Sequence, residues 1–454
     1  MSSEKLNEEC AVFGVCLTTD DALGFTYNGL LALQHRGQEG AGIAVVCDNN
    51  IRCSRGLGLV SDLYNKLSRL PKSKIAIGHT RYSTSGVSSK KNTGPFLTEY
   101  LTGRIAVSHN GHITNAEKIK NELRKCGVRF DAKSDSEVAS KLMAYCIDIE
   151  KDLIKGITIA AERLTGAFSL TIASFEDKLI AVRDPSGYRP LCIGKGENGY
   201  AISSESCALD VCGFELVRDV EPGEIVVIEN GEIIMQGIKF NNGDTKRGLC
   251  IFEYVYFARQ DSVIDDLSVF DARYNMGEVL AREIPAEADV VCGVPDSGLD
   301  AAAGFASASG LPLVTGFVKN RYIGRSFIFP TQLQRDNAVR LKLNPLSAKI
   351  SGKKVVLVDD SIVRGTTIEK IVHNLKSVGA KEVHVRISSP PFKYTCGYGT
   401  DIDSEDKLIA NNLAHDEICS KIGADSLGYI SIEGLREACG KCALSFCTSC
   451  FTGK

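Results

Sequence analysis

The chain has 454 residues, of which 44% are apolar and 24% are charged. This mix excludes an intrinsically disordered protein and a small scaffold held together by disulfides. The net charge is only −3, which argues against a broad surface for nucleic acid or anionic membrane. No apolar run reaches the roughly 18 residues of a membrane span, so we expect neither nucleic acid nor membrane as a partner. Domains average about 100–200 residues, so two or three are expected.

The first nine residues are polar, contain three glutamates and lack the apolar core of a secretory signal. We therefore predict a cytoplasmic protein. In that compartment its 17 cysteines are not expected to form disulfides. Some are interpreted as small buried residues, and others are candidates for catalysis or metal binding.

The first half of the chain has the pattern of an α+β sandwich, with two layers of strands and flanking helices. Helices are expected over Asn115–Cys126 and 136–149, and a hairpin over Glu224–Glu232. The polar segment Asn241–Gly248 is the best linker candidate, so we divide the chain into 10–240 and 241–454. Short apolar runs between turns predict strands at Ala11–Leu17, Gly42–Cys47, Ile75–His79, Ile105–His109, Phe168–Ala173 and Leu179–Val182.

The second half alternates apolar strands with helical stretches, which predicts an α/β domain with a parallel sheet and helices on both faces. The helices are expected near 298–309 and over Thr366–Val378. Ligands of such sheets bind at the carboxyl ends of the strands. The strands are expected at Asp289–Val294, Leu313–Val318, Lys354–Val358 and Glu382–Ser388.

The sharpest local signal is KVVLVDDSIVRGTT at Lys354–Thr367. A buried strand ends there in two carboxylates, Asp359 and Asp360, and a short loop containing Gly365 leads into a helix. Backbone N–H groups at a helix N-terminus bind phosphate. Adjacent carboxylates suit ribose hydroxyls or Mg²⁺, which prefers oxygen ligands. The run therefore predicts a site for a phosphorylated sugar.

This run resembles the phosphoribosyl-pyrophosphate (PRPP) loop of type I phosphoribosyltransferases. The resemblance implies that Asp359 and Asp360 hold ribose and Mg²⁺. The turn GVPDSG at Gly293–Gly298 is similar to the family's pyrophosphate loop, with Ser297 as a third Mg²⁺ ligand. The basic stretch Lys319–Arg335 resembles the mobile loop that closes over PRPP. The residues that the resemblance assigns to PRPP are Asp359, Asp360, Ser361, Arg364, Gly365, Thr366, Thr367, Lys319 and Arg321.

Cys10 directly precedes an apolar strand, and by itself such a cysteine is a buried core residue. In the context EECAVFGV, however, it resembles the nucleophile of the N-terminal-nucleophile glutamine amidotransferases. The resemblance implies a propeptide over residues 1–9, with Cys10 as the mature first residue. A freed α-amino group has a pKa of about 7.7–8.0 and is partly neutral near pH 7. It can therefore activate the thiol.

Four further motifs match that class in order: QHRGQ, GHTRYSTSG, SHNGH and SDSE. The resemblance implies that Arg81 holds the carboxylate of glutamine and Asp135 its ammonium group, as their charges allow. Attack on the amide places negative charge on its oxygen, which the Asn110 side chain and the Gly111 N–H suit as an oxyanion hole. Arg36 and Gly37 of the first motif are assigned to glutamine as well. Each residue alone also fits an ordinary ion pair or turn.

Taken together, residues 10–454 resemble the glutamine phosphoribosylpyrophosphate amidotransferases. The resemblance implies that glutamine, PRPP and water give 5-phosphoribosylamine, glutamate and pyrophosphate, the first step of purine synthesis. Ammonia would cross an internal apolar passage, with Tyr82 and Tyr256 linking the sites. It also implies a homotetramer inhibited by purine nucleotides. Alternatives are a PRPP-sensing regulator, which needs no nucleophile, and a glutamine-dependent transferase with another acceptor.

The last cysteines, Cys439-x₂-Cys442 and Cys447-x₂-Cys450, form a pattern plausible for zinc when taken alone. The iron–sulfur branch of the same family points to a [4Fe–4S] cluster instead. The ligands implied by this resemblance are Cys250, Cys396, Cys447 and Cys450. Zinc and the absence of any metal stay open as alternatives. One departure from the family pattern is Gln260, which stands where relatives usually have proline.

Overall fold

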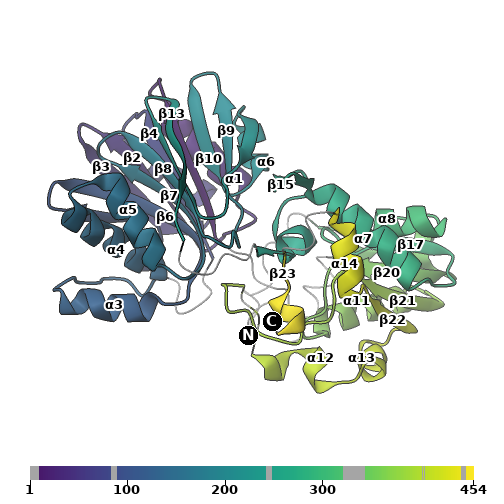
Figure 1. Ribbon diagram of the computed structural model, residues 1–454. Helices are drawn as coiled ribbons and strands as arrows, with labels where there is room; N and C mark the ends of the chain where they lie inside the picture. Colours follow the sequence, from purple (N-terminus) through teal and green to yellow (C-terminus); the bar gives the residue numbers. More distant parts are fainter. Residues whose placement is uncertain are drawn as a thin grey trace.

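The computed structural model describes residues 10–82, 89–241, 248–320, 343–400, 402, 404–440 and 446–453. Figure 1 shows two lobes, one built on packed antiparallel sheets and the other on a parallel sheet. Within the described ranges, no helix combines the length and the apolarity needed to cross a membrane.

The first lobe contains two sheets that face one another. In the described chain, one sheet has seven strands in the order β11-β9-β10-β1-β4-β2-β3 and the other has six in the order β13-β12-β8-β7-β6-β5. The strands of the first sheet are β1 (Ala11–Leu17), β2 (Gly40–Cys47), β3 (Asn50–Leu57), β4 (Ile75–Arg81), β9 (Cys192–Gly196), β10 (Gly199–Ser203) and β11 (Glu215–Asp219). Those of the second are β5 (Phe96–Tyr100), β6 (Gly103–Ile113), β7 (Gly166–Ser174), β8 (Lys178–Arg183), β12 (Glu224–Glu229) and β13 (Glu232–Lys239).

Helices cover both outer faces, so the lobe has the predicted αββα layering. In β1, Phe13 and Val15 pack beneath α1 (Ala22–Ala32), whereas Val12 and Cys16 point into the core between the sheets. This alternation follows from the two-residue period of a strand. The first sheet is also covered by α6 (Ser206–Val211), and a short α2 spans Tyr64–Leu67. The other face carries α3 (Ala116–Lys125), α4 (Asp135–Glu150) and α5 (Leu153–Arg163), seen together in Figure 1.

The second lobe is built on a parallel sheet in the order β17-β20-β21-β22. In β20, Val356 and Val358 join one core, while Val355 and Leu357 join another. Helices thus cover both faces, and the predicted fold class is confirmed. The strands are β17 (Val290–Gly293), β20 (Lys354–Asp359), β21 (Glu382–Ile387) and β22 (Ser426–Tyr429). The helices are α7 (Val269–Glu283), α8 (Leu299–Ser309), α11 (Thr366–Ser377), α13 (His415–Ile422) and α14 (Ile432–Ala438).

The strand predicted at Leu313–Val318 is wrong as a member of the parallel sheet. Only Leu313 bridges to Val291. The chain then turns away, and β18 (Phe317–Lys319) pairs antiparallel with β19 (Leu343–Pro345). Pro312 has no N–H for a ladder. A Cβ on Gly316 would lie 2.7 Å from the Cys292 sulfur, so the backbone here packs directly on a side chain.

Short elements join the two lobes. A parallel pair, β14 (Leu249–Cys250) with β23 (Phe446–Cys447), lies beside a π-helical turn at Glu253–Phe257. The short elements not yet named, which occur in both lobes, are β15 (Val263–Ile264), β16 (Leu267–Ser268), α10 (Ser347–Ile350), α12 (Ile409–Asn412), α15 (Ser449–Thr452) and 3₁₀ turns at Ser61–Leu63, Lys90–Asn92 and Glu405–Lys407. The division of the chain at residue 240 stays a prediction.

Two helical glycines are expected to respond oppositely to alanine. A Cβ on Gly277 of α7 would lie 1.9 Å from the Ala301 carbonyl of α8, whereas a Cβ on Gly24 of α1 meets nothing within 4 Å. Gly277→Ala should lower the free energy of unfolding by about 2–3 kcal/mol because the helices must separate. Gly24→Ala should raise it by about 0.5–1 kcal/mol. Urea denaturation measures both, and equal shifts would contradict the close packing of α7 on α8.

Candidate active site

A pocket of about 300 Å³ opens beside Cys10. Its lining includes Arg81 from the end of β4, Gly111 from β6 and Asp135 from the start of α4. Gly399 of the second lobe also lines it. The pocket therefore brings together residues that are widely separated in the sequence, and both lobes contribute to its wall.

Cys10 owes its place to strand pairing. In the antiparallel register of β1 and β4, Ala11 lies opposite Thr80, which brings Cys10 next to Arg81. The Cys10 thiol donates to the backbone oxygen of Tyr82 at 3.5 Å. The predicted nucleophile is thus half-buried at the edge of a sheet, with its sulfur toward the segment that follows β4.

Arg36 and Gly37 lie behind Cys10 and are not among the lining residues of the pocket. The Arg36 Nε donates to the Cys10 carbonyl at 3.3 Å, and its other nitrogens are bonded to Glu205 and Glu253. A Cβ on Gly37 would lie 2.7 Å from the Arg81 backbone nitrogen. These contacts place both residues against the backbone of Cys10 and Arg81, where they support the pocket. Their assignment to glutamine stays a prediction.

Arg81 and Asp135 supply opposite charges to the pocket. The Arg81 side chain is largely buried, and its Nη1 finds no hydrogen-bond partner in the described part of the chain. Asp135 is fixed by two backbone donors, because its Oδ1 accepts from Ser136 at 2.8 Å and its Oδ2 from Ile113 at 2.9 Å. A guanidinium and a carboxylate in one pocket match the two charges of a free amino acid.

Asn110 and Gly111 follow one another on β6. Asn110 is fully buried, and neither atom of its amide has a hydrogen-bond partner among the described residues. A buried amide without partners is costly, which favours a group that acts on a bound ligand. Gly111 has φ +135°, and a Cβ there would lie 2.2 Å from the Ala167 carbonyl. Only glycine fits this position, so its N–H is held in a fixed direction.

Two buried histidines, His79 and His109, also line the pocket. The His79 Nε2 lies 3.0 Å from the His109 carbonyl oxygen, and the His109 Nδ1 lies 3.0 Å from the Ser136 hydroxyl. Burial, with the charge of Arg81 adding to it, lowers the pKa of His79 to about 3. Burial also lowers the pKa of His109. Both rings are therefore neutral near pH 7 and support the pocket without adding charge.

The low pKa of His79 predicts a loss of stability in acid. Below its ordinary pKa of 6.5 the histidine of the unfolded chain takes up a proton, while the folded chain resists until about pH 3. The free energy of unfolding should therefore fall as pH is lowered, by about 2 kcal/mol at pH 5 from this group. Urea titrations of His79→Gln should lack that part of the fall. His415→Gln, which alters an exposed histidine, is the control; an unchanged pH dependence in His79→Gln would contradict the assignment.

The second candidate site lies at the carboxyl end of β20. Asp359 and Asp360 are buried there, and the Asp359 Oδ1 accepts from the Asp360 N–H at 3.0 Å. The Ser297 hydroxyl, from the turn after β17, donates to Asp360. The parallel pairing of β17 with β20 brings the two turns together. Three oxygen-bearing side chains thus meet at one edge of the sheet, a donor set that fits Mg²⁺.

The loop after Asp360 runs into the N-terminus of α11. Gly365 has φ +87°, and a Cβ there would lie 2.6 Å from the Ile409 side chain. The hydroxyl of Thr366 is buried and has no hydrogen-bond partner in the described ranges. Ser361 donates to Asp360, and Arg364 and Thr367 belong to the same turn. A helix of 12 residues begins at Thr366, so its first N–H groups can hold a phosphate.

Only part of the predicted covering loop is described. Lys319 pairs with Asp296 of the turn between β17 and α8, which places its ammonium group beside the second candidate site. Arg321 lies outside the described residues, as do Arg325 and Arg335.

The four cysteines of the predicted cluster come from three separate segments. Cys250 pairs with Cys447 in the register of β14 and β23. Burial and the nearby thiols of Cys396 and Cys447 raise the pKa of Cys450. In the described part of the chain, however, no three potential ligands converge on a single metal ion. The [4Fe–4S] cluster and the zinc alternative both stay predictions from the sequence. Cys442 lies outside the described residues.

Sequence reasoning missed three residues around the first pocket. Glu205 and Glu253 are fully buried partners of Arg36, and Gly399 contributes to the pocket wall. None of them belongs to a motif, and each carboxylate is joined to Arg36 by contacts across more than 160 positions of sequence. A buried pair of carboxylates between the lobes leaves no periodic signal in the chain.

Two family models match the chain. One, described as a glutamine amidotransferase domain, matches residues 79–211, and the other, a phosphoribosyl transferase domain, matches residues 265–388. Curated relatives include the amidophosphoribosyltransferase of Archaeoglobus fulgidus, 46% identical over 98% of this chain and 97% of its own. That of Methanocaldococcus jannaschii is also 46% identical, with the same shares covered.

Solved structures agree with these matches. One, the allosteric regulatory enzyme of purine biosynthesis, has a TM-score of 0.90 at 42% identity, and the match covers 98% of this chain and 96% of that one. Another is the glutamine PRPP amidotransferase of B. subtilis complexed with ADP and GMP. Its TM-score is 0.89 at 41% identity, and the match covers 98% of this chain and 97% of that one.

Proposed function

This chain belongs to the amidophosphoribosyltransferase family, and from that membership we propose how its residues divide the work. The chain is a glutamine-dependent phosphoribosyltransferase of purine biosynthesis. It converts glutamine, PRPP and water into 5-phosphoribosylamine, glutamate and pyrophosphate. The observation that carries the assignment of residues is the meeting of Cys10, Arg81 and Asp135 around one pocket.

In the first lobe, Cys10 is the nucleophile. Once residues 1–9 are removed, its α-amine takes the thiol proton, and the sulfur attacks the amide carbon of glutamine. The carbon–nitrogen bond breaks, the nitrogen leaves as ammonia with that proton, and a thioester remains. Water then cleaves the thioester to glutamate and restores the thiol. Arg81 and Asp135 hold the carboxylate and the ammonium group of glutamine throughout.

The oxyanion that forms during attack lies between the Asn110 amide and the Gly111 N–H. The fully buried amide of Asn110 supports this role, because it offers a donor that need not be reorganised as charge develops. Gly111 supports it through a backbone direction that only glycine adopts at φ +135°. Removal of one such donor typically costs about 10²–10³-fold in rate.

In the second lobe, Asp359 and Asp360 hold the ribose hydroxyls, and the turn Ser361–Thr367 holds the 5′-phosphate at the start of α11. Asp359, Asp360 and Ser297 would hold Mg²⁺, which neutralises charge on the departing pyrophosphate when bound. Lys319, next to Asp296, faces the same region. Arg321 keeps its proposed role in covering PRPP. Nitrogen attacks C1 of the ribose as the bond from C1 to pyrophosphate breaks.

Ammonia passes between the sites through apolar surroundings. Phe252, the residue before the turn Glu253–Phe257, packs against Phe392. The same core includes Val363 of the phosphate loop. Tyr256 contacts Phe252 and Phe257 in the same cluster, and Tyr82 receives the hydrogen bond of Cys10. An apolar path keeps ammonia unprotonated, and only the unprotonated form is a nucleophile.

Further properties are part of the proposal. Cys250, Cys396, Cys447 and Cys450 would hold a [4Fe–4S] cluster that ties the tail to the second lobe, with no part in the chemistry. The B. subtilis relative is complexed with ADP and GMP, which supports purine nucleotides as inhibitors. The tetramer, the cytoplasmic location and the removal of residues 1–9 stay predictions from the sequence.

One assay tests the proposal. With glutamine, PRPP and Mg²⁺ together, glutamate and pyrophosphate should appear in a one-to-one ratio, and N-terminal sequencing should begin at Cys10. Glutamate without pyrophosphate would contradict the coupling of the two sites. A fully active chain that still carries residues 1–9 would exclude the terminal amine as the base.

A further inference from the structure

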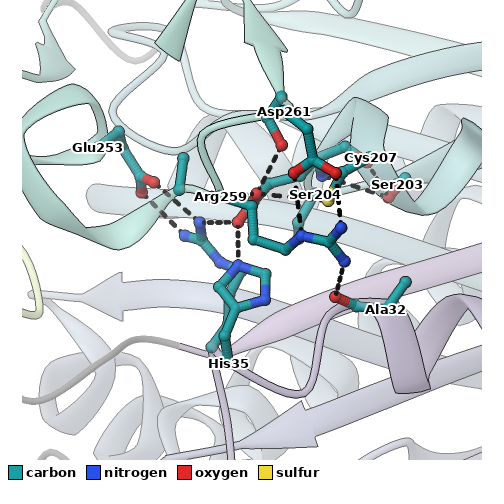
Figure 2. A network of polar contacts seen from close by, with 12 residues as sticks. Ala32, His35, Ser203, Ser204, Cys207, Glu253, Arg259 and Asp261 are labelled. Atoms are coloured by element: carbon teal, nitrogen blue, oxygen red, sulfur yellow. Dashed lines mark hydrogen bonds and ion pairs between the residues drawn. The ribbon is translucent and has the colours of Figure 1, made fainter. Parts of the chain in front are cut away.

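Glu253 stands at the junction between the two lobes. It is fully buried and begins the π-helical turn Glu253–Phe257. Its two carboxylate oxygens accept from Arg36, Oε2 from Nη1 at 2.8 Å and Oε1 from Nη2 at 2.9 Å. Figure 2 shows this two-bonded fork at the edge of a larger polar network. Such paired bonds fix both the distance and the angle between the two planar groups.

The same guanidinium reaches the nucleophile. The Arg36 Nε donates to the carbonyl of Cys10 at 3.3 Å. A guanidinium is rigid and planar, so a shift of Glu253 moves the group that bonds the Cys10 backbone. Glu205 also accepts from Arg36, at 2.7 Å. Its remaining partners, among them His35 and Ser262, do not line the pocket.

A second path leads from Glu253 to the pocket wall. The Glu253 Oε1 accepts from the Arg189 Nη1 at 3.4 Å, and the Arg189 Nη2 donates to the Tyr398 carbonyl at 2.9 Å. The next residue, Gly399, lines the glutamine pocket. A Cβ on Gly399 would lie 2.9 Å from the Cβ of His112, so this wall is packed closely on the strand that carries Gly111.

We propose that Glu253 is a positioning residue for glutamine cleavage, acting on the Cys10 backbone through Arg36 and on the wall at Tyr398–Thr400 through Arg189. The inference rests on the proposed function. A single carboxylate of the second lobe thereby fixes the position of both the nucleophile and one wall of the glutamine pocket. A purely structural ion pair would stabilise the junction without favouring either reaction.

The test uses Glu253→Gln in the full chain, assayed with glutamine and separately with ammonium as nitrogen source. The amide keeps the shape of the carboxylate but loses its charge and one acceptor. We expect kcat/KM for glutamine to fall about 10–100-fold, with turnover of PRPP and ammonium within about twofold. Alkylation of Cys10 by a glutamine-like diazoketone should slow in parallel, and Glu253→Asp should recover part of the loss.

Asp265→Asn is the matched control. Asp265 forms another bond between the lobes, accepting from Arg183 at 3.0 Å, but neither of these two residues lines the glutamine pocket. It should leave the ratio of glutamine to ammonium activity unchanged. If Glu253→Gln does not fold, Gly399→Ala tests the wall alone and should raise KM for glutamine at least fivefold.

The outcomes separate the inference from the proposed function. Equal loss with both nitrogen sources, or unchanged glutamine kinetics in a folded Glu253→Gln, would overturn the positioning role. An unchanged KM for glutamine in Gly399→Ala would overturn the part of the proposal that runs from Glu253 through Arg189 to the pocket wall. A wild-type chain that releases no pyrophosphate with either nitrogen source would instead refute the proposed function itself.

Discussion

Cys10→Ala should abolish glutamine-dependent turnover, with a loss of about 10³-fold or more, and keep turnover of PRPP with ammonium within about twofold. The reason is the separation of the two sites: Cys10 lines the pocket of the first lobe, whereas Asp359 and Asp360 lie at the end of β20 in the second. Pyrophosphate release with each nitrogen source measures both activities in one preparation.

The control for this variant is Cys16→Ala on the same strand. Burial raises the pKa of the Cys16 thiol to about 11, so it stays protonated near pH 7 and is no nucleophile. Cys16→Ala should therefore retain glutamine turnover. Loss of both activities in a well-folded Cys10→Ala chain would contradict independent half-sites, and full glutamine activity would exclude Cys10 as the nucleophile.

Asp359→Asn should lower PRPP turnover about 10²-fold with either nitrogen source. The carboxylate is buried at the strand end and, in the proposed mechanism, bears the negative charge that binds ribose and Mg²⁺. Asparagine keeps the size of the side chain but removes that charge. Hydrolysis of glutamine in the absence of PRPP should be unaffected, because Cys10, Arg81 and Asp135 lie in the other lobe.

Asp289→Asn provides a carboxylate control at the opposite end of the sheet. The Asp289 Oδ2 accepts from the backbone N–H of Lys354 at 2.8 Å, so it contacts the first residue of the strand whose last residue is Asp359. We expect unchanged PRPP turnover there. If Asp359→Asn and Asp289→Asn behaved alike, the assignment of the PRPP site to the carboxyl end of β20 would be wrong.

The sequence predicts the elements and residues that local pattern determines. β1 at Ala11–Leu17 has the predicted bounds, because an apolar run preceded by Cys10 and ended by polar residues has little freedom. The Asp359–Thr367 motif lies, as predicted, at a strand end and helix start. These assignments rest on neighbours in sequence, which strand and helix periods record directly.

What depends on distant contacts is not predictable from the sequence. Arg36 sits in a motif that favours contact with glutamine, but its guanidinium is held by carboxylates 169 and 217 positions away. The run at Leu313–Val318 is as apolar as a central strand, yet it turns away from the sheet after one bridge. In both cases the contacts of the residues are determined by a segment far away in the sequence, and the local sequence does not indicate where that segment lies.

Gly399 completes the cavity around a nucleophile that lies 389 positions before it in the chain. Consider a gene split so that each lobe is made as a separate polypeptide. The first lobe would then expose one side of its bound glutamine to solvent until the second lobe bound to it. A glutaminase lobe can therefore be combined with another transferase domain only if that domain supplies the missing wall of the glutamine pocket.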